Sequence, residues 1–205
     1  MYLKIYQCRH NQSAYGPYRA TVIWVSGCTI RCRECFNSQL FDGSRGDKRS
    51  PLWLLIKVLT GKKLGDRAVV FVGGEPMDQP FPLLISILFL RLIIPSLILT
   101  IYSGYSYPAL KSLWIKRLAL QFADYLIDGP YLSHLALDDH GYRGSANQRV
   151  IDLKASRLLD QVTVADWNHL IVIDDKQITA SQPLSRDLHL SGPIEECGSI
   201  QKEVS

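Results

Sequence analysis

Short apolar runs alternate with longer amphipathic segments over roughly the first 130 positions of the chain. Four of these runs have the length and composition of buried β-strands. Strands that alternate with helices predict an α/β fold whose parallel sheet has right-handed crossovers. The four expected strands are Ala20–Val25, Ala68–Val72, Leu97–Tyr102 and Ala123–Ile127.

Three helices are expected between these strands. Ser50 is a typical N-cap residue, and Pro51 stands at the first helical position, so a helix is predicted through Leu59 with Gly61 at its end. Two further helices are predicted over Pro82–Ile94 and Ala109–Leu120.

One apolar stretch is long enough to suggest a membrane span. Phe81–Tyr102 contains a single charged residue, Arg91. Pro95 would interrupt a spanning helix, whereas a buried helix followed by a buried strand leaves no polar group in lipid. We therefore expect no contact with a membrane.

The pattern changes after Leu153. The segments Asn168–Asp174 and Gln177–Ala180 flank a charged Asp-Lys turn and predict a short hairpin. Ser181–Ser205 has little periodicity and is expected to be partly disordered. The predicted organisation is a main domain over residues 1–153 and a C-terminal extension over residues 154–205.

Polar and glycine-rich motifs follow each of the four predicted strands. In parallel sheets, ligands bind beyond the carboxyl ends of the strands. A cysteine-rich segment follows the first strand. Because all four motifs follow parallel strands, we predict that they meet at one edge of the sheet and form a single binding site. The other three motifs are Gly73-Gly74-Glu75-Pro76, Ser103-Gly104-Tyr105 and Asp128-Gly129.

Cys28, Cys32 and Cys35 form a C-x3-C-x2-C motif directly after the first strand. A [4Fe–4S] cluster with a full thiolate set needs four cysteines. Three cysteines would leave one iron open to a small molecule, as in catalytic metal sites. The alternative is a structural zinc site completed by Cys8 or His10, although only the Cys32–Cys35 pair has typical zinc-ribbon spacing.

Together with the Gly73–Pro76 motif, this cysteine motif resembles the radical S-adenosylmethionine (SAM) superfamily. Within it, the chain is most similar to the activating enzymes of anaerobic (class III) ribonucleotide reductase. The narrower resemblance rests on Tyr102–Tyr105, Asp128–Tyr131 and Arg143–Asp152, and it covers roughly residues 1–153. It implies an incomplete (β/α) barrel that is open along one side.

The resemblance also implies an activity. A reduced [4Fe–4S] cluster would cleave SAM to a 5′-deoxyadenosyl radical, and that radical would install a glycyl radical on a large partner protein. The implied partners are the large glycyl-radical subunit of anaerobic ribonucleotide reductase and a low-potential electron donor such as flavodoxin or ferredoxin.

The same resemblance assigns roles to individual residues. The three cysteines would ligate the cluster, Gly73 and Gly74 would let the backbone approach a ligand, and Glu75 would supply a carboxylate or a backbone acceptor near the SAM ammonium group. Pro76 would fix the exit of the turn. The backbone around Glu34, Cys35 and Phe36 would flank the nucleoside, and Ser103 and Gly104 would line its ribose side.

The amino-acid composition excludes few classes of function. With 205 residues, 47% of them apolar, the chain can bury the core of one full domain. The net charge of +4 comes from scattered lysine and arginine residues and does not indicate nucleic-acid binding. Five cysteines, three of them clustered, favour a metal site in the reducing cytoplasm.

Two further functions stay open at this level. The same radical chemistry could act on another protein or on a small molecule, which the additional residues 154–205 favour. A non-enzymatic metal-binding or electron-transfer module could also carry these three cysteines. The Arg143–Asp152 segment could either order a loop or contact a partner.

Overall fold

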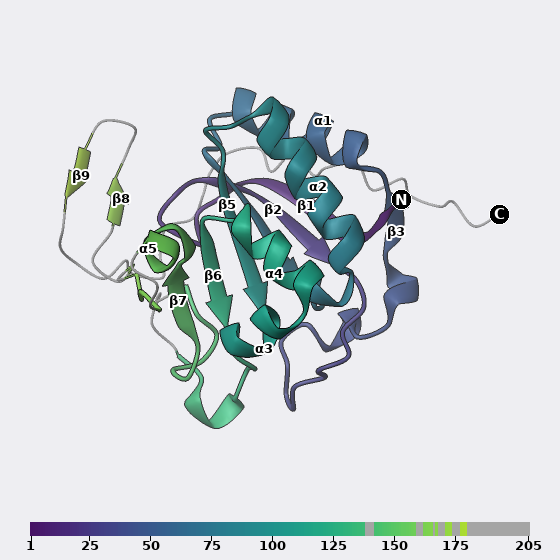
Figure 1. Cartoon of the computed structure of the whole chain (residues 1–205), viewed down its shortest axis with the longest axis vertical. Helices are drawn as coiled ribbons and strands as arrows, with labels where there is room; N and C mark the ends of the chain where they lie inside the picture. The colour runs from purple at the N-terminus through teal and green to yellow at the C-terminus, as the bar shows by residue number, and fades with distance from the viewer. Residues whose placement is uncertain (138–141, 159–161, 166, 168–170, 174–176, 180–205) are drawn as a thin grey trace.

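The computed structural model describes residues 1–137, 142–158, 162–165, 167, 171–173 and 177–179. Within them, the main sheet has seven strands in the order β3-β1-β2-β4-β5-β6-β7 (Figure 1). The strands are β1 (Leu3–Gln12), β2 (Ala20–Val25), β3 (Asp47–Arg49), β4 (Ala68–Gly73), β5 (Ile98–Ser103), β6 (Tyr125–Asp128) and β7 (Arg149–Asp152).

The four predicted strands form the centre of this sheet. β2, β4, β5 and β6 pair in parallel, as expected from their alternation with helices. β1 and β3 on one side and β7 on the other pair antiparallel to their neighbours. The prediction of an α/β fold with parallel strands is confirmed, and the sheet is open and does not close into a barrel.

The antiparallel edge strands were not predicted. In β1, the inward side chains of Leu3, Ile5 and Cys8 are buried, but a register shift between Ile5 and Gln7 breaks the period of two. β7 lies inside the polar Arg143–Asp152 segment, and only Val150 and Ile151 are buried there. Neither strand has a continuous apolar run that would reveal it.

Helices cover one face of the sheet. α1 (Pro51–Lys63), α2 (Pro80–Ile93) and α4 (Trp114–Gln121) lie side by side on that face (Figure 1). The short helices α3 (Tyr107–Ser112) and α5 (Leu153–Leu158) precede α4 and follow β7. The main core lies between the sheet and these helices and includes the fully buried Phe71, Ile87 and Leu99. No helix in the described part of the chain is long and apolar enough to span a membrane.

Two predicted helix boundaries were wrong. α1 continues past Gly61 to Lys63. Gly61 faces the sheet at a point where no side chain fits, so close packing and not helix termination accounts for this glycine. The helix expected over Ala109–Leu120 is two helices, since Leu113 has extended dihedrals (φ −100°, ψ 117°) and separates α3 from α4.

Aromatic side chains cover part of the opposite face. Trp167 is buried and packs edge-on against Tyr125 and Tyr142, with ring centroids 4.8 and 5.8 Å away. Residues 163–165 accompany it and hydrogen-bond to the backbone of β7. Part of the segment after Leu153 is thus packed against the sheet.

The predicted hairpin is present in the described residues. β8 (Ile171–Ile173) pairs antiparallel with β9 (Gln177–Thr179). The residues expected to form its turn, and the tail from Ser181 to Ser205, lie outside the described part of the chain.

Gly61 provides a test of this packing. A Cβ atom at Gly61 would lie 2.0 Å from Thr21 Oγ1 and 2.6 Å from Asp66 Oδ2. A glycine-to-alanine change inside a helix normally stabilises it by about 1 kcal/mol. We expect Gly61→Ala to destabilise the apoprotein instead, by about 1–3 kcal/mol, because the change overpacks the helix–sheet contact. Urea unfolding measures this, with Lys62→Ala as the control on the exposed side of α1. A stabilised Gly61→Ala variant would contradict the packing.

Candidate functional site

The site is built where the pairing of β2 and β4 continues beyond the strands. Gly74 N–H donates to Val25 O at 2.9 Å, and Glu75 N–H donates to Gly27 O at 2.8 Å. A Cβ at Gly74 would lie 2.4 Å from Gly27 O, so only glycine permits this approach. The Gly-Gly-Glu-Pro turn therefore lies directly against the start of the cysteine loop (residues 26–37).

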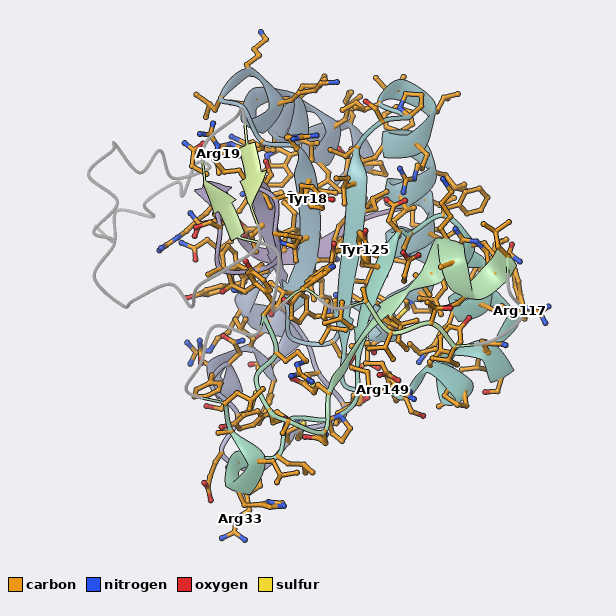
Figure 2. The ribbon with its side chains drawn as sticks, turned by 90° about the vertical axis from the view of Figure 1, so that its left-hand side faces the viewer. Tyr18, Arg19, Arg33, Arg117, Tyr125 and Arg149 are labelled. Atoms are coloured by element: carbon orange, nitrogen blue, oxygen red, sulfur yellow. The ribbon has the colours of Figure 1, made fainter. Side chains whose placement is uncertain are left out.

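The cysteine loop is also tied to the segment that follows it. Gly27 N–H donates to Leu40 O at 2.8 Å, and Cys28 N–H donates to Phe41 O at 3.2 Å. Arg31 and Glu34 have φ angles of +50° and +57°, which turn the chain between the cysteines. Figure 2 shows Arg33 at one end of the molecule and Arg19, which precedes β2, near the other. The cysteine loop therefore lies at the carboxyl end of the parallel strands.

The three cysteines have the chemistry of a cluster site. Cys28, Cys32 and Cys35 are partly buried, and none of them forms a disulfide. Burial raises the pKa of the Cys28 and Cys35 thiols. A bound cation compensates for such burial because it holds the sulfur as thiolate. Three soft donors on one partly exposed loop fit an iron–sulfur cluster.

The two residues expected to complete a zinc site, Cys8 and His10, lie away from the cysteine loop. Among the described residues, no three Cys, His, Asp or Glu side chains converge to hold a metal ion. Cys8 lies in the core, and His10 Nδ1 is 3.1 Å from Thr21 Oγ1 at the opposite end of β2.

Glu75 is an internal carboxylate that joins two loops of the site. Its Oε1 accepts hydrogen bonds from Met77 N at 2.8 Å and Ser103 Oγ at 2.9 Å, and its Oε2 accepts one from Gly104 N at 2.8 Å. The residue is only 1% exposed. Burial raises its pKa to about 7, although the three hydrogen bonds act in the opposite direction.

A second carboxylate joins three loops, and sequence reasoning missed it. Asp78 Oδ2 accepts from Thr29 N at 2.7 Å and from Thr29 Oγ1 at 2.8 Å. Its Oδ1 accepts from the Tyr105 hydroxyl at 2.7 Å. Asp78 lies three residues after Glu75, outside the recognised motif, so its sequence position did not reveal its role.

A cleft with a volume of about 750 Å³ lies beside the cysteine loop. One wall consists of loop residues Ile30–Glu34, and the other consists of Pro130–His134. At the adjoining edge, the Phe36 ring contacts the Tyr131 ring at a centroid distance of 4.8 Å. This volume is in the range of small-molecule and cofactor sites.

The Arg143–Asp152 segment orders the second wall of this cleft. Asn147 Nδ2 donates to Pro130 O at 2.8 Å, and Gln148 Nε2 donates to Gly129 O at 2.9 Å. Arg149 forms a two-point ion pair with the buried Asp128. These contacts favour the structural interpretation of the segment.

The structure places the predicted site residues in two groups. One group surrounds the Glu75 carboxylate, where the loops after β2, β4 and β5 meet. Glu34 and the 71% exposed Phe36 lie further along the cysteine loop, at the cleft. The first group comprises Gly73, Gly74, Glu75, Pro76, Ser103 and Gly104.

Comparison with known proteins identifies the family. The model of the 4Fe-4S single cluster domain matches residues 15–151, which include the cysteine loop and all four parallel strands. The chain belongs to the 4Fe-4S single cluster domain family. The match supports an iron–sulfur cluster as the cofactor of this domain.

Relatives of this 4Fe-4S domain protein are activating proteins. The chain is 30% identical over 139 residues to the anaerobic ribonucleoside-triphosphate reductase-activating protein of Pasteurella multocida (strain Pm70), covering 65% of this chain and 87% of that protein. It is 27% identical over 160 residues to the protein of the same name from Enterobacteria phage T4, covering 73% and 92%.

A third relative is the pyruvate formate-lyase-activating enzyme of Clostridium pasteurianum. It is 38% identical over 68 residues, which are 32% of this chain and 29% of that enzyme. The predicted membership of the radical SAM activating enzymes is confirmed by these relatives together with the family match.

The buried Glu75 predicts a pH dependence of stability. Its pKa is raised from 4.5 to about 7, so it stabilises the fold at low pH, where it is protonated in both states. As pH rises from 4.5 to 7, the unfolded state loses the proton first, and up to roughly 3 kcal/mol of stability is lost. We expect Glu75→Gln to remove this loss. Urea unfolding of the apoprotein between pH 4 and 8 measures it.

The exposed Asp47 is the control for this measurement, because Asp47→Asn should keep the wild-type slope. Equal slopes for the wild-type protein and Glu75→Gln would show that Glu75 is not the titrating group.

Proposed function

We propose that this protein is a radical SAM activating enzyme that installs a glycyl radical on the large subunit of anaerobic ribonucleotide reductase. The observation that carries the proposal is the contact between the cysteine loop and the Gly-Gly-Glu-Pro turn. The chain also covers 87% of the length of a related activating protein. In this proposal Cys28, Cys32 and Cys35 hold a [4Fe–4S] cluster with one open iron.

When bound, the reduced cluster would supply one electron to SAM, which would break into methionine and a 5′-deoxyadenosyl radical, and this radical would take a hydrogen atom from a glycine of the partner. The protein's part is to bind, orient and shield. Gly73 and Gly74 bring backbone polar groups close to the cluster loop. Glu75 positions the loop after β5 through its hydrogen bonds with Ser103 and Gly104. Pro76 is buried and fixes the direction in which the chain leaves the turn.

The cleft beside the loop is assigned to the nucleoside. We assign Glu34 and Phe36 to the flank of the nucleoside, because Glu34 lines this cleft and the Phe36 ring contacts the Tyr131 ring beside it. Aromatic rings at this edge would exclude water from the reacting groups. Ser103 and Gly104 are assigned to its ribose side.

Several finer features belong to the same proposal. We interpret the open sheet with its four parallel central strands as an incomplete (β/α) barrel, whose open side would admit a loop of a macromolecular substrate. The electron would come from a low-potential donor such as flavodoxin or ferredoxin. A reducing cytoplasm suits three thiolates that hold a cluster. The residues after 153 form an extension to this domain.

A second substrate is the main alternative. The pyruvate formate-lyase-activating enzyme is 38% identical over 68 residues, so the shared segment does not by itself select one partner. A non-enzymatic electron-transfer module would bind the same cluster and leave SAM intact.

The cysteine assignment predicts the iron content of variants. After anaerobic reconstitution with iron and sulfide, Cys28→Ala, Cys32→Ala and Cys35→Ala should each lose most of the cluster, because only three protein ligands hold it. Cys8→Ala should keep it, since Cys8 lies in the core. Iron analysis and the electron paramagnetic resonance (EPR) signal of the reduced protein measure this. A colourless wild-type protein containing zinc would contradict the assignment.

The activity has a direct test. The reduced protein with SAM should release 5′-deoxyadenosine and, with the cognate reductase subunit, produce a glycyl-radical EPR signal. Release of 5′-deoxyadenosine without a glycyl signal in that subunit would move the assignment to another substrate. Absence of SAM cleavage in a protein with an intact cluster would favour the electron-transfer module.

A further inference from the structure

We propose that Asp78 and Tyr105 are positioning residues that fix the cysteine loop in the geometry needed to accept the cluster. This inference rests on the proposed function, because it concerns how the loop receives the cluster. It concerns Asp78, which lies outside the recognised motifs, and Tyr105, to which no role has been assigned so far. Both residues act through Thr29.

The contact is made to the residue next to the first cysteine. Thr29 follows Cys28, and both its backbone N–H and its hydroxyl donate to one oxygen of Asp78, at 2.7 and 2.8 Å. A carboxylate that accepts two hydrogen bonds from one residue fixes the backbone and the χ1 angle of that residue together. The direction in which the chain leaves Cys28 is therefore set from outside the loop.

Tyr105 closes the arrangement into a triangle. Its hydroxyl donates to the other oxygen of Asp78 at 2.7 Å and lies 3.0 Å from Thr29 Oγ1. The Lys116 ammonium lies 3.9 Å from the centroid of the Tyr105 ring and holds that ring in a cation–π contact. The loops after β2, β4 and β5 thus meet at three side chains.

The base of this triangle is anchored by buried residues, whereas the residue that it holds in the cysteine loop is exposed. Asp78 ends a 3-10 turn that begins at Pro76, and both Pro76 and Met77 are buried. Met77 N–H is bound to the Glu75 carboxylate, and Asp78 N–H to Glu75 O. Thr29 is exposed. Asp78 is held by these contacts, so its hydrogen bonds restrain the exposed Thr29 and not the reverse.

The neighbouring residue supports the same role. Gln79 Nε2 donates to Ser26 O at 3.1 Å, two residues before Cys28. Asp78 at the end of the 3-10 turn and Gln79 directly after it therefore hold the chain on both sides of this first cysteine. Both oxygens of Asp78 are bound by protein donors, which suits positioning and leaves the chemistry to other groups.

The first test uses apoprotein, so it does not depend on the cluster. Hydrogen exchange of the Thr29 amide, followed by NMR, reports the bond to Asp78 directly. In Asp78→Ala we expect this amide to exchange about tenfold faster, the effect of one charge-assisted hydrogen bond. In Tyr105→Phe, which keeps the charge and removes only the hydroxyl, we expect about threefold.

Two controls accompany this measurement. Asp47→Ala removes an exposed carboxylate of β3 and should leave the Thr29 amide unchanged. The Gly104 amide, which donates to Glu75, should keep its wild-type exchange rate in Tyr105→Phe, and this distinguishes a local release from general loosening.

The second test measures the cluster itself. After anaerobic reconstitution, Asp78→Ala should hold less than half of the wild-type iron, and its EPR signal should change less than that of the wild-type protein when SAM is added. Tyr105→Phe should lie between the two, and Asp78→Asn, which keeps one acceptor oxygen, should recover part of the iron. Asp47→Ala should match the wild-type protein.

The outcomes separate this inference from the proposed function. A wild-type protein that binds no cluster overturns the proposed function. A wild-type protein that binds the cluster, with Asp78→Ala equal to it in iron content and EPR response, overturns the positioning role alone. An unchanged Thr29 exchange rate in Asp78→Ala overturns it as well.

Discussion

The site depends on the backbone pairing of β2 with β4, which continues past both strands. Hydrogen bonds from Gly74 to Val25 and from Glu75 to Gly27 join the turn after β4 to the start of the cysteine loop. This pairing requires two backbones to approach closely, so residue 74 has no room for a side chain. The contacts of Glu75 and Asp78 are built on this junction.

Two carboxylates connect this junction to the end of β5 and the loop that follows it. Glu75 binds the loop after β5 from inside the protein, and Asp78 binds Tyr105 and Thr29 from its edge. The buried carboxylate lies in a poorly solvated environment that raises its pKa, which is the cost of using a charged group as an internal link. These hydrogen bonds hold the loops in place before a cofactor binds. The free energy of binding is then not reduced by the entropy cost of ordering the loops.

The far wall of the cleft follows the same principle with different residues. Asn147 and Gln148 bind the carbonyl groups of Pro130 and Gly129, and the Arg149–Asp128 ion pair joins β7 to the end of β6. Side-chain amides can satisfy the backbone groups of a segment that is in neither helix nor strand. The edge strand β7 therefore contributes to the site by supporting the wall, although it supplies no predicted ligand.

The sequence by itself determined the four parallel strands, the edge at which the motifs meet and the chemistry of the three cysteines, because apolar runs and local spacing carry that information. It did not reveal β1, the continuation of α1 past Gly61 or the break at Leu113, where packing outweighs the local pattern. Only the tertiary structure decided that the Glu75 side chain is bound internally and that Asp78 contacts Thr29. Such contacts join residues up to about fifty positions apart, and a single chain's local pattern does not encode which of its carboxylates will meet which loop.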